Sequence, residues 1–294
     1  MKKSLLILPI AICFAISSFA QDRYEFDFRH NDPNDVAKLL ILAETGIDGA
    51  LALGAIDLNL GLIVRYSLND KIDLQAKIRK SYLNFEMDPA YRKNFEMEYV
   101  GTLFIRDNTK LKDERVVVSS SERGNTITTN FFHTNLPQRN AFGFNGGINF
   151  KTVGINPKNT DYNGPLKNVN FTTLSIIGGL QFKRINASVV QVKKPRVNRI
   201  FDNYTVMTID GIITPVNTFS DALTGESVGK ELKSDGLKNA LPFGARFTYN
   251  VYGSIPSYSG ANSFRYTISS SIGYRPYLGF HFDFGIGFMI LRNM

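Results

Sequence analysis

Cysteine is almost absent from this chain of 294 residues, because Cys13 is its only cysteine. It falls in a leader that combines Lys2 and Lys3 with an apolar stretch, Leu5 to Phe14, and small residues up to Ala20. That is the pattern of a secretory signal peptide, so we expect residues 1–20 to be removed on export. The mature chain would then have no disulfide and no cysteine nucleophile, which suits a bacterial envelope protein.

Long apolar runs are also lacking after the leader. The best candidate, Val36 to Ile56, is interrupted by Lys38, Glu44 and Asp48, whereas a membrane-spanning helix needs about 20 mostly apolar residues. The pattern therefore excludes a helical membrane protein. Tryptophan is absent too, but 23 Phe, 13 Tyr and 24 Gly are present. This composition favours strands with aromatic belts and close backbone packing.

Motifs for cofactors and metals are missing as well. The chain has no glycine-rich dinucleotide or phosphate loop, no His-Glu-x-x-His and no calcium-loop pattern. We expect neither a cofactor nor a metal site. The net charge is +8, but nucleic acid is not an expected partner for an exported chain, and anionic lipid headgroups fit the charge better.

The segment from Leu278 to Ile290 shows what the chain does contain. Its even-numbered residues are all large and apolar, whereas the odd-numbered ones include His281, Asp283 and several glycines. Side chains alternate between the two faces of a strand, so one face is hydrocarbon and the other is small or polar. This face is either the inside of a soluble sandwich or the lipid-facing side of a membrane barrel.

Similar alternation recurs along the chain and favours the barrel. We expect about ten strands of about 10–14 residues, the length of a tilted membrane-spanning strand, whereas strands in soluble proteins average about 5–6. The clearest segments are residues 57–68, 71–85, 95–106, 141–153, 171–183, 243–253, 264–274 and 278–290. Residues 115–135 form one long strand or two short ones, and residues 136–138 form a connection. Residues 194–240 read as a long outer loop with a small hairpin that turns at Asp210-Gly211.

The N-terminal part of the mature chain reads differently. Asp32 and Pro33 suit a helix start, Val36, Leu39, Leu40 and Ala43 fall on one helical stripe, and Gly46 can end it. We therefore expect a short helix within a periplasmic segment, residues 21–48, followed by the barrel over residues 49–294. The last strand should close the barrel against the strand that begins near Asp57.

These features resemble the outer-membrane β-barrel proteins of Gram-negative, Bacteroidota-type bacteria. The resemblance rests on the leader ending at Phe19-Ala20, the alternating strands and the closing strand Leu278 to Ile290. It implies an all-β, antiparallel transmembrane barrel of about ten strands, with a range of about 8–12. Its partners would be outer-membrane lipid and the barrel-assembly machinery. Such barrels often end on an aromatic residue, whereas Leu291-Arg292-Asn293-Met294 follows the strand here.

Charged residues collect on the face opposite the apolar one. They are expected to line the lumen because a basic side chain facing lipid costs about 2–4 kcal/mol near the midplane. An interior filled by ion pairs is favoured over a mildly anion-preferring lumen, since about 8 strands are just filled by side chains. The expected lining is basic at Arg65, Lys77, Arg79, Arg106, Lys151, Lys183, Arg246 and Arg265, and acidic at Asp57, Asp73, Glu96, Glu98 and Asp283.

A nucleophile, a base and an acid also share the inward face near the chain end. Ser269 or Ser271 with His281 and Asp283 contains the residue types of a hydrolase triad. The leading hypothesis is nevertheless a non-enzymatic barrel, either a narrow pore for a small solute or a scaffold that binds a surface protein through its long loop. A barrel hydrolase and a soluble periplasmic sandwich or lipocalin-like binder are the alternatives.

Overall fold

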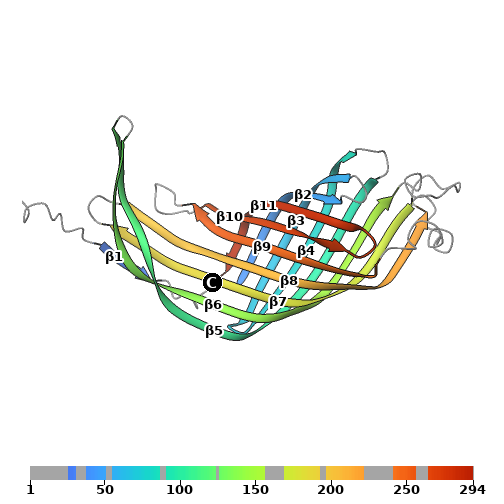
Figure 1. Ribbon diagram of the computed structural model, residues 1–294, viewed down its shortest axis with the longest axis horizontal. Helices are drawn as coiled ribbons and strands as arrows, with labels where there is room; N and C mark the ends of the chain where they lie inside the picture. Colours follow the sequence, from blue (N-terminus) through green and yellow to red (C-terminus); the bar gives the residue numbers. More distant parts are fainter. Residues whose placement is uncertain are drawn as a thin grey trace, which may run out of the picture.

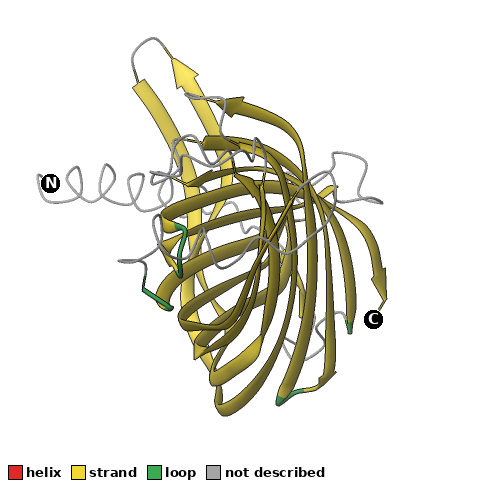
Figure 2. Ribbon diagram, turned by 90° about the vertical axis from the view of Figure 1, so that its right-hand side faces the viewer, coloured by secondary structure: helices red, strands yellow, loops and turns green. Residues whose placement is uncertain are grey.

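The computed structural model describes residues 26–30, 38–50, 55–86, 91–123, 126–155, 169–192, 197–221, 241–255 and 264–293. Nearly all of these residues are in strands (Figures 1 and 2). The strands are β1 (Phe26–His30), β2 (Leu39–Ala50), β3 (Ala55–Asn69), β4 (Ile72–Glu86), β5 (Tyr91–Arg123), β6 (Thr126–Ile155), β7 (Val169–Val192), β8 (Val197–Asp221), β9 (Phe243–Ile255), β10 (Phe264–Arg275) and β11 (Gly279–Asn293). The expected leader, residues 1–20, lies outside the described residues.

Strands β2 to β11 form a closed antiparallel barrel. Each strand pairs with its neighbours in sequence, and β11 pairs with β2 to complete the circle. The prediction of an all-β barrel of about ten strands is therefore confirmed. The remaining strand, β1, pairs with the end of β7 at residues 188–192.

The two faces of the barrel wall differ as the alternation predicts. On β3, the outward residues Leu60 and Leu62 are exposed, whereas the inward residues Asp57, Asn59 and Arg65 are buried. Every barrel strand has at least one large apolar side chain exposed on its outer face, for example Ile47, Leu60, Leu74, Tyr99, Phe144, Ile176, Ile209, Phe247, Ile272 and Phe284. The polar side chains are thus inside, the reverse of a water-soluble binding barrel.

The prediction of an N-terminal helix is wrong over the residues that the structure describes, because Leu39–Ala50 forms strand β2. The barrel begins at Leu39 instead of residue 49. The start of β2 is apolar on both faces, because the inward residues Leu40 and Leu42 are apolar like their outward neighbours. Leu42 belongs to an apolar cluster inside the barrel. A strand that is apolar on both faces has no period-2 signal, and a helical stripe then fits it equally well.

The partner of the last strand also differs from the prediction. Strand β11 pairs with β2, from His281 opposite Ala50 to Asn293 opposite Leu39, and not with the strand near Asp57. The described chain ends are therefore at one end of the barrel, together with the tight turn between β3 and β4. The opposite end carries the turn between β10 and β11.

Two expected connections are strand instead. Strand β8 runs through the expected turn at Asp210-Gly211, so the predicted loop 194–240 is wrong over residues 197–221; residues 222–240 lie outside the described residues. Strand β6 likewise runs through residues 136–138. As a result, β5 and β6 continue as a pair far beyond the neighbouring strands, at the end that holds the chain termini (Figures 1 and 2).

Two glycines in the barrel wall should respond differently to alanine. A Cβ atom at the inward Gly147 would lie 2.1 Å from the Tyr99 carbonyl oxygen, whereas one at the outward Gly178 has no atom within 4 Å. Gly147→Ala should therefore lower the free energy of unfolding by about 1–3 kcal/mol, and Gly178→Ala should change it by less than about 1 kcal/mol. Urea unfolding in detergent micelles measures both, and equal losses would contradict this packing.

Candidate functional site

The interior of the barrel is the candidate site because it gathers charge from all ten strands. Between the two ends, the described inward residues include eight acidic and seven basic side chains. This near balance does not support an anion-preferring lumen. The acidic residues are Glu44, Asp48, Asp57, Asp73, Glu96, Glu98, Asp210 and Asp283, and the basic ones are Arg65, Lys77, Arg79, Lys151, Lys183, Arg246 and Arg275.

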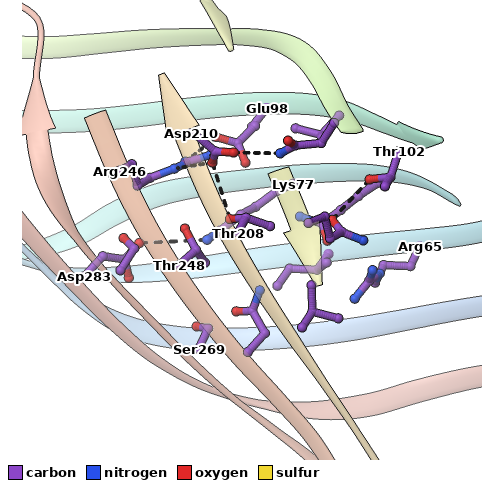
Figure 3. Close-up of a pocket in the computed structure, with 18 of the residues that line it drawn as sticks. Arg65, Lys77, Glu98, Thr102, Thr208, Asp210, Arg246, Thr248, Ser269 and Asp283 are labelled. Carbon is purple, nitrogen blue, oxygen red and sulfur yellow. Dashed lines mark hydrogen bonds and ion pairs between the residues drawn. The ribbon is translucent and has the colours of Figure 1, made fainter. Parts of the chain in front are cut away.

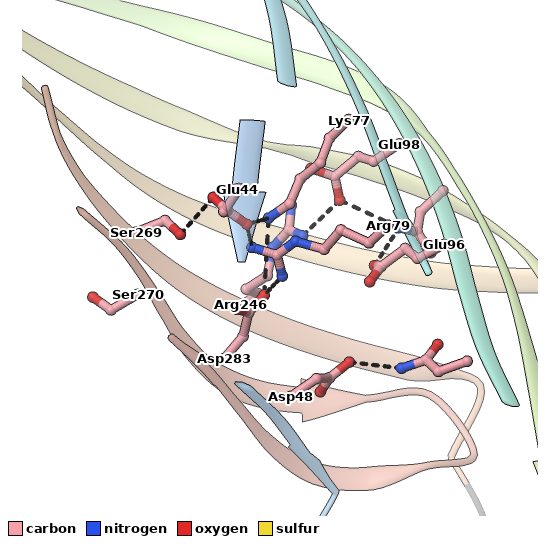
Figure 4. A network of polar contacts seen from close by, with 12 residues as sticks. Glu44, Asp48, Lys77, Arg79, Glu96, Glu98, Arg246, Ser269, Ser270 and Asp283 are labelled. Atoms are coloured by element: carbon pink, nitrogen blue, oxygen red, sulfur yellow. Dashed lines mark hydrogen bonds and ion pairs between the residues drawn. The ribbon is translucent and has the colours of Figure 1, made fainter. Parts of the chain in front are cut away.

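One network lies at mid-depth and reaches the strands that close the barrel (Figure 4). Arg79 on β4 forms ion pairs with Glu44 on β2 and with Asp283 on β11. Lys77 Nζ lies 4.0 Å from Glu44 and 3.8 Å from Asp283. The Ser269 hydroxyl donates to Glu44 Oε2 over 2.8 Å. Both carboxylates are thus compensated by cations from β4.

A second network at similar depth joins other strands (Figure 3). Arg246 on β9 forms ion pairs with Glu98 on β5 at 2.6 Å and with Asp210 on β8 at 2.9 Å. Asn145 donates to Asp210 Oδ1 over 2.6 Å, and Asn149 donates to Glu98 Oε2 over 3.3 Å. The pair between β9 and β5 crosses the lumen, since these strands are not neighbours in the sheet.

A third network lies toward the end that carries the β10–β11 turn. Asp48 accepts a hydrogen bond from Lys151 Nζ at 2.9 Å and lies 3.7 Å from Arg275 Nη1. Asn94 donates to the same carboxylate over 2.9 Å. Arg275 also reaches Glu96 at 3.4 Å. These contacts join β2, β5, β6 and β10 across the lumen.

The other end is closed by mixed apolar and charged contacts. Leu42 and Ile63 on one wall pack with Val206 and Tyr252 from β8 and β9 on another. The rings of Tyr204 and Tyr252 stack at 4.2 Å. The Asp73 carboxylate lies 2.7 Å from Lys183 Nζ and 3.7 Å from Arg65 Nη2, and the Arg65 guanidinium lies 5.3 Å from the Tyr204 ring centre.

A small cavity remains between these layers. Its volume is about 50 Å³, and its lining includes Lys77, Gln181, Arg246, Thr248 and Asp283 (Figure 3). A cavity needs about 10–15 Å³ to hold one water molecule, so this one has room for a few waters. The described interior is filled mainly by its own ion-paired side chains.

The predicted lining residues occupy the following places. Eleven of the thirteen face the interior: Asp57, Arg65, Asp73, Lys77, Arg79, Glu96, Glu98, Lys151, Lys183, Arg246 and Asp283. Arg265 lies on β10, but its side chain is outside those described. Arg106 does not face inward, because a bulge after Phe104 pairs it with the outward Phe142 and leaves it exposed.

Besides Arg139, which is buried on β6 just after the expected connection at 136–138, sequence reasoning missed four charged interior residues. Glu44 and Asp48 fell in the expected periplasmic segment 21–48, Asp210 fell in the expected hairpin turn, and Arg275 lay just beyond the expected strand 264–274. All four continue the inward parity of their strands. Extending the segment 264–274 by one residue would have found Arg275, because it repeats the inward positions of Thr267 and Ser269 on β10.

The residues considered for catalysis share the inner wall without forming a triad. Ser271 lies opposite Asp283, and Gly273 lies opposite His281. The His281 ring is 1% exposed, and neither of its nitrogens has a hydrogen-bond partner among the described residues. Asp283 pairs with Arg79, and Ser269 donates to Glu44. Ser269 and Asp283 therefore bind other partners, and His281 forms no hydrogen bond with either of them.

Among the described residues, no group of three or more His, Cys, Asp or Glu side chains is placed to hold a metal ion. Within the same residues, no helix is long and apolar enough to cross a membrane.

Comparison with known proteins identifies no family for this chain. No family model matches it, and no curated protein matches it. Among solved structures, it is similar to OmpT (in-vitro folded), an outer membrane protein of Vibrio cholerae. The identity is 10%, with 90% of this chain and 99% of that chain covered and a TM-score of 0.18. So low a score does not establish a shared fold, and the barrel architecture follows from the strand pairing.

Proposed function

We propose that this protein is an integral outer-membrane β-barrel with a closed interior, which acts as a scaffold and not as an enzyme. The observation that carries the proposal is the belt of exposed apolar side chains on all ten strands, opposite an interior that holds the charge. In lipid this is the favourable arrangement, since a basic side chain on the outer face costs about 2–4 kcal/mol at the midplane. In water the same belt would favour aggregation.

Strand length supports the same placement. The shortest barrel strands, β2 and β10, have 12 residues each, and β9 has 13. A transmembrane strand tilted by about 45° needs about 9–11 residues. Even the shortest strands are therefore long enough to cross the hydrocarbon layer.

The connections support an orientation. At the end opposite the chain termini, the connections are residues 51–54, 87–90, 156–168, 222–242 and 276–278, whereas the termini end has residues 70–71, 124–125, 193–196 and 256–263. The two longest connections thus lie at the end opposite the termini. Outer-membrane barrels have short periplasmic turns and longer extracellular loops. We place the termini and the projecting β5–β6 hairpin in the periplasm, and residues 222–242 at the cell surface.

The filled interior favours a scaffold over an open pore. Ion pairs cross the lumen at mid-depth, and an apolar cluster crosses it near the termini end. Within this proposal the partners are outer-membrane lipid, the barrel-assembly machinery and a protein bound at the surface loop. Transport of a small solute would require these side chains to separate.

Purification and bilayer recording test this proposal together. The folded protein should require detergent and migrate faster on a gel before heating than after it. Added to planar bilayers, the reconstituted barrel should give no steady conductance steps above the leak. A monomer that stays folded in water without detergent would overturn the membrane placement. Steady conductance steps would overturn the closed scaffold and favour a narrow pore.

A further inference from the structure

The first and last barrel strands, β2 and β11, form a seam that differs from every other pair in the barrel. All other neighbouring strands are joined by a connection in the chain, whereas β2 and β11 are separated by the whole barrel sequence. Bringing distant segments together costs more chain entropy than closing a short turn. The seam therefore depends more than the other pairs on contacts between its own strands.

On the inner face, the seam has one apolar contact, Leu42 opposite Met289, and its polar positions have no attractive pair of their own. Asp48 lies directly opposite Asp283, and like charges in such pairs are destabilising. Gly46 lies opposite Gly285, and Glu44 lies opposite Gly287, so these positions offer no pair of packed side chains. A Cβ atom at Gly285 would lie 2.6 Å from Ser269 Oγ, which leaves no room for a larger residue.

On the outer face, the seam pairs are apolar apart from Thr45, which lies opposite Ile286. Ile47 lies opposite Phe284, and Ala43 lies opposite Phe288. In lipid such pairs have no hydrophobic driving force, because acyl chains are as apolar as the side chains. Backbone hydrogen bonds, the Leu42–Met289 contact and the inner charges are left to hold the two strands together.

Cations from other strands supply the missing attraction. Arg79 on β4 pairs with Glu44 on one seam strand and Asp283 on the other, and its side chain is only 4% exposed. Lys77 approaches the same two carboxylates, while Lys151 and Arg275 compensate Asp48. Arg79 thus bridges the seam from inside the lumen.

We propose that the β2–β11 seam is the strand pair at which this barrel opens, and that Arg79 is the residue that holds it closed. Loss of the Arg79 charge leaves Glu44 and Asp283 with Lys77 as their remaining nearby cation, while Asp48 keeps Lys151 and Arg275. Opening there would part the wall sideways while the other nine strand pairs stay joined. The inference goes beyond the scaffold role and would hold equally for a pore.

Hydrogen exchange of the full-length barrel in detergent micelles tests the proposal. Arg79→Gln should speed amide exchange in β2 and β11 by about ten-fold or more and leave β6 and β7 unchanged, because local opening exposes only the strands that part. The matched control is Arg246→Gln, which also removes two buried ion pairs, but to β5 and β8. It should leave exchange in β2 and β11 unchanged.

Two further variants separate seam opening from general damage. Adding Glu44→Gln and Asp283→Asn to Arg79→Gln should return the exchange in β2 and β11 toward the wild-type rate. A disulfide between Thr45→Cys and Ile286→Cys, which lie opposite each other on the seam, should suppress the fast exchange of Arg79→Gln. If Arg79→Gln does not fold, Arg79→Lys and Arg246→Lys provide the same comparison, since lysine lacks the fork that bridges two carboxylates.

The proposal is overturned if the Arg79 variant exchanges like the wild type in β2 and β11, or if it loses protection evenly over all strands. It is also overturned if the Arg246 variant opens the seam to the same extent. Failure of the scaffold role would appear separately, as conductance of the wild-type protein.

Discussion

Replacing Ile176 with arginine is expected to lower the free energy of unfolding by about 2–4 kcal/mol in a lipid environment. Ile176 is 54% exposed on the outer face of β7, between Ile148 on β6 and Ile213 on β8. If this face contacts acyl chains, the guanidinium cannot be hydrated without disturbing the bilayer. The loss can be measured by urea unfolding of the barrel reconstituted in phospholipid vesicles.

Leu111 provides the matched control for this substitution. It is 71% exposed, but it lies on the part of β5 that projects beyond the last residue paired with β4, Leu103. There an arginine would be in water, so Leu111→Arg should change stability by no more than about 0.5 kcal/mol. Similar costs at Ile176 and Leu111 would contradict a lipid belt confined to the barrel.

Replacing Asp73 with asparagine is expected to cost about 3–5 kcal/mol, because it leaves buried cations without their partner. The Asp73 carboxylate compensates both Lys183 and Arg65, whose side chains are each 7% exposed. The Ser67 hydroxyl also donates to it over 2.7 Å. Asparagine keeps the size of the side chain, so the loss reports on charge and not on packing. Urea unfolding in micelles gives the value.

A rescue and a surface control sharpen this prediction. Adding Lys183→Gln to Asp73→Asn should recover part of the lost stability, since one uncompensated charge is then removed. By contrast, Lys112→Gln breaks the exposed Lys112–Glu114 pair on the projecting hairpin, and should cost no more than about 1 kcal/mol. The interior network has a minor structural role if Asp73→Asn costs no more than this surface change.

The sequence predicts the barrel because most of its strands alternate strictly. In β3, in residues 141–151 of β6 and in residues 280–290 of β11, every outward position is apolar or small and nearly every inward position is polar or small, so the period of 2 is clear. The fold class and the strand number follow from these segments. The same alternation of inward and outward positions predicts that Arg79 and Arg246 point into the barrel.

The sequence fails where an interior contact reverses the usual pattern. Leu40 and Leu42 are buried on the inner face, and Leu42 belongs to an apolar cluster. Strand β2 therefore has no polar face at its start and resembles a helix in sequence. Asp210-Gly211 has the composition of a turn, yet Asp210 pairs with Arg246 inside the barrel and Gly211 lies opposite Gly178 on the outer face. Only the tertiary contacts distinguish these cases.

The partners within the charge network could not be predicted either. Parity places Glu98 and Arg246 on the same inner face, but β5 and β9 are not neighbours in the sheet. Their 2.6 Å contact depends on the barrel diameter and on the length of an arginine side chain. The same holds for Arg79, which reaches β11 across β3 and β2.

The most direct test of a lipid-embedded, inside-polar barrel is spin labelling along β7. With Cys13 replaced by serine, the chain has no other cysteine, so single cysteines can be placed in turn at residues 173–183. In phospholipid vesicles, collisions with oxygen should peak at the outward positions Leu174, Ile176, Leu180 and Phe182. They should be low at Thr173, Ser175, Gln181 and Lys183, and a water-soluble nickel chelate should reach neither set. Ready access of the nickel chelate to the outward positions would contradict the account.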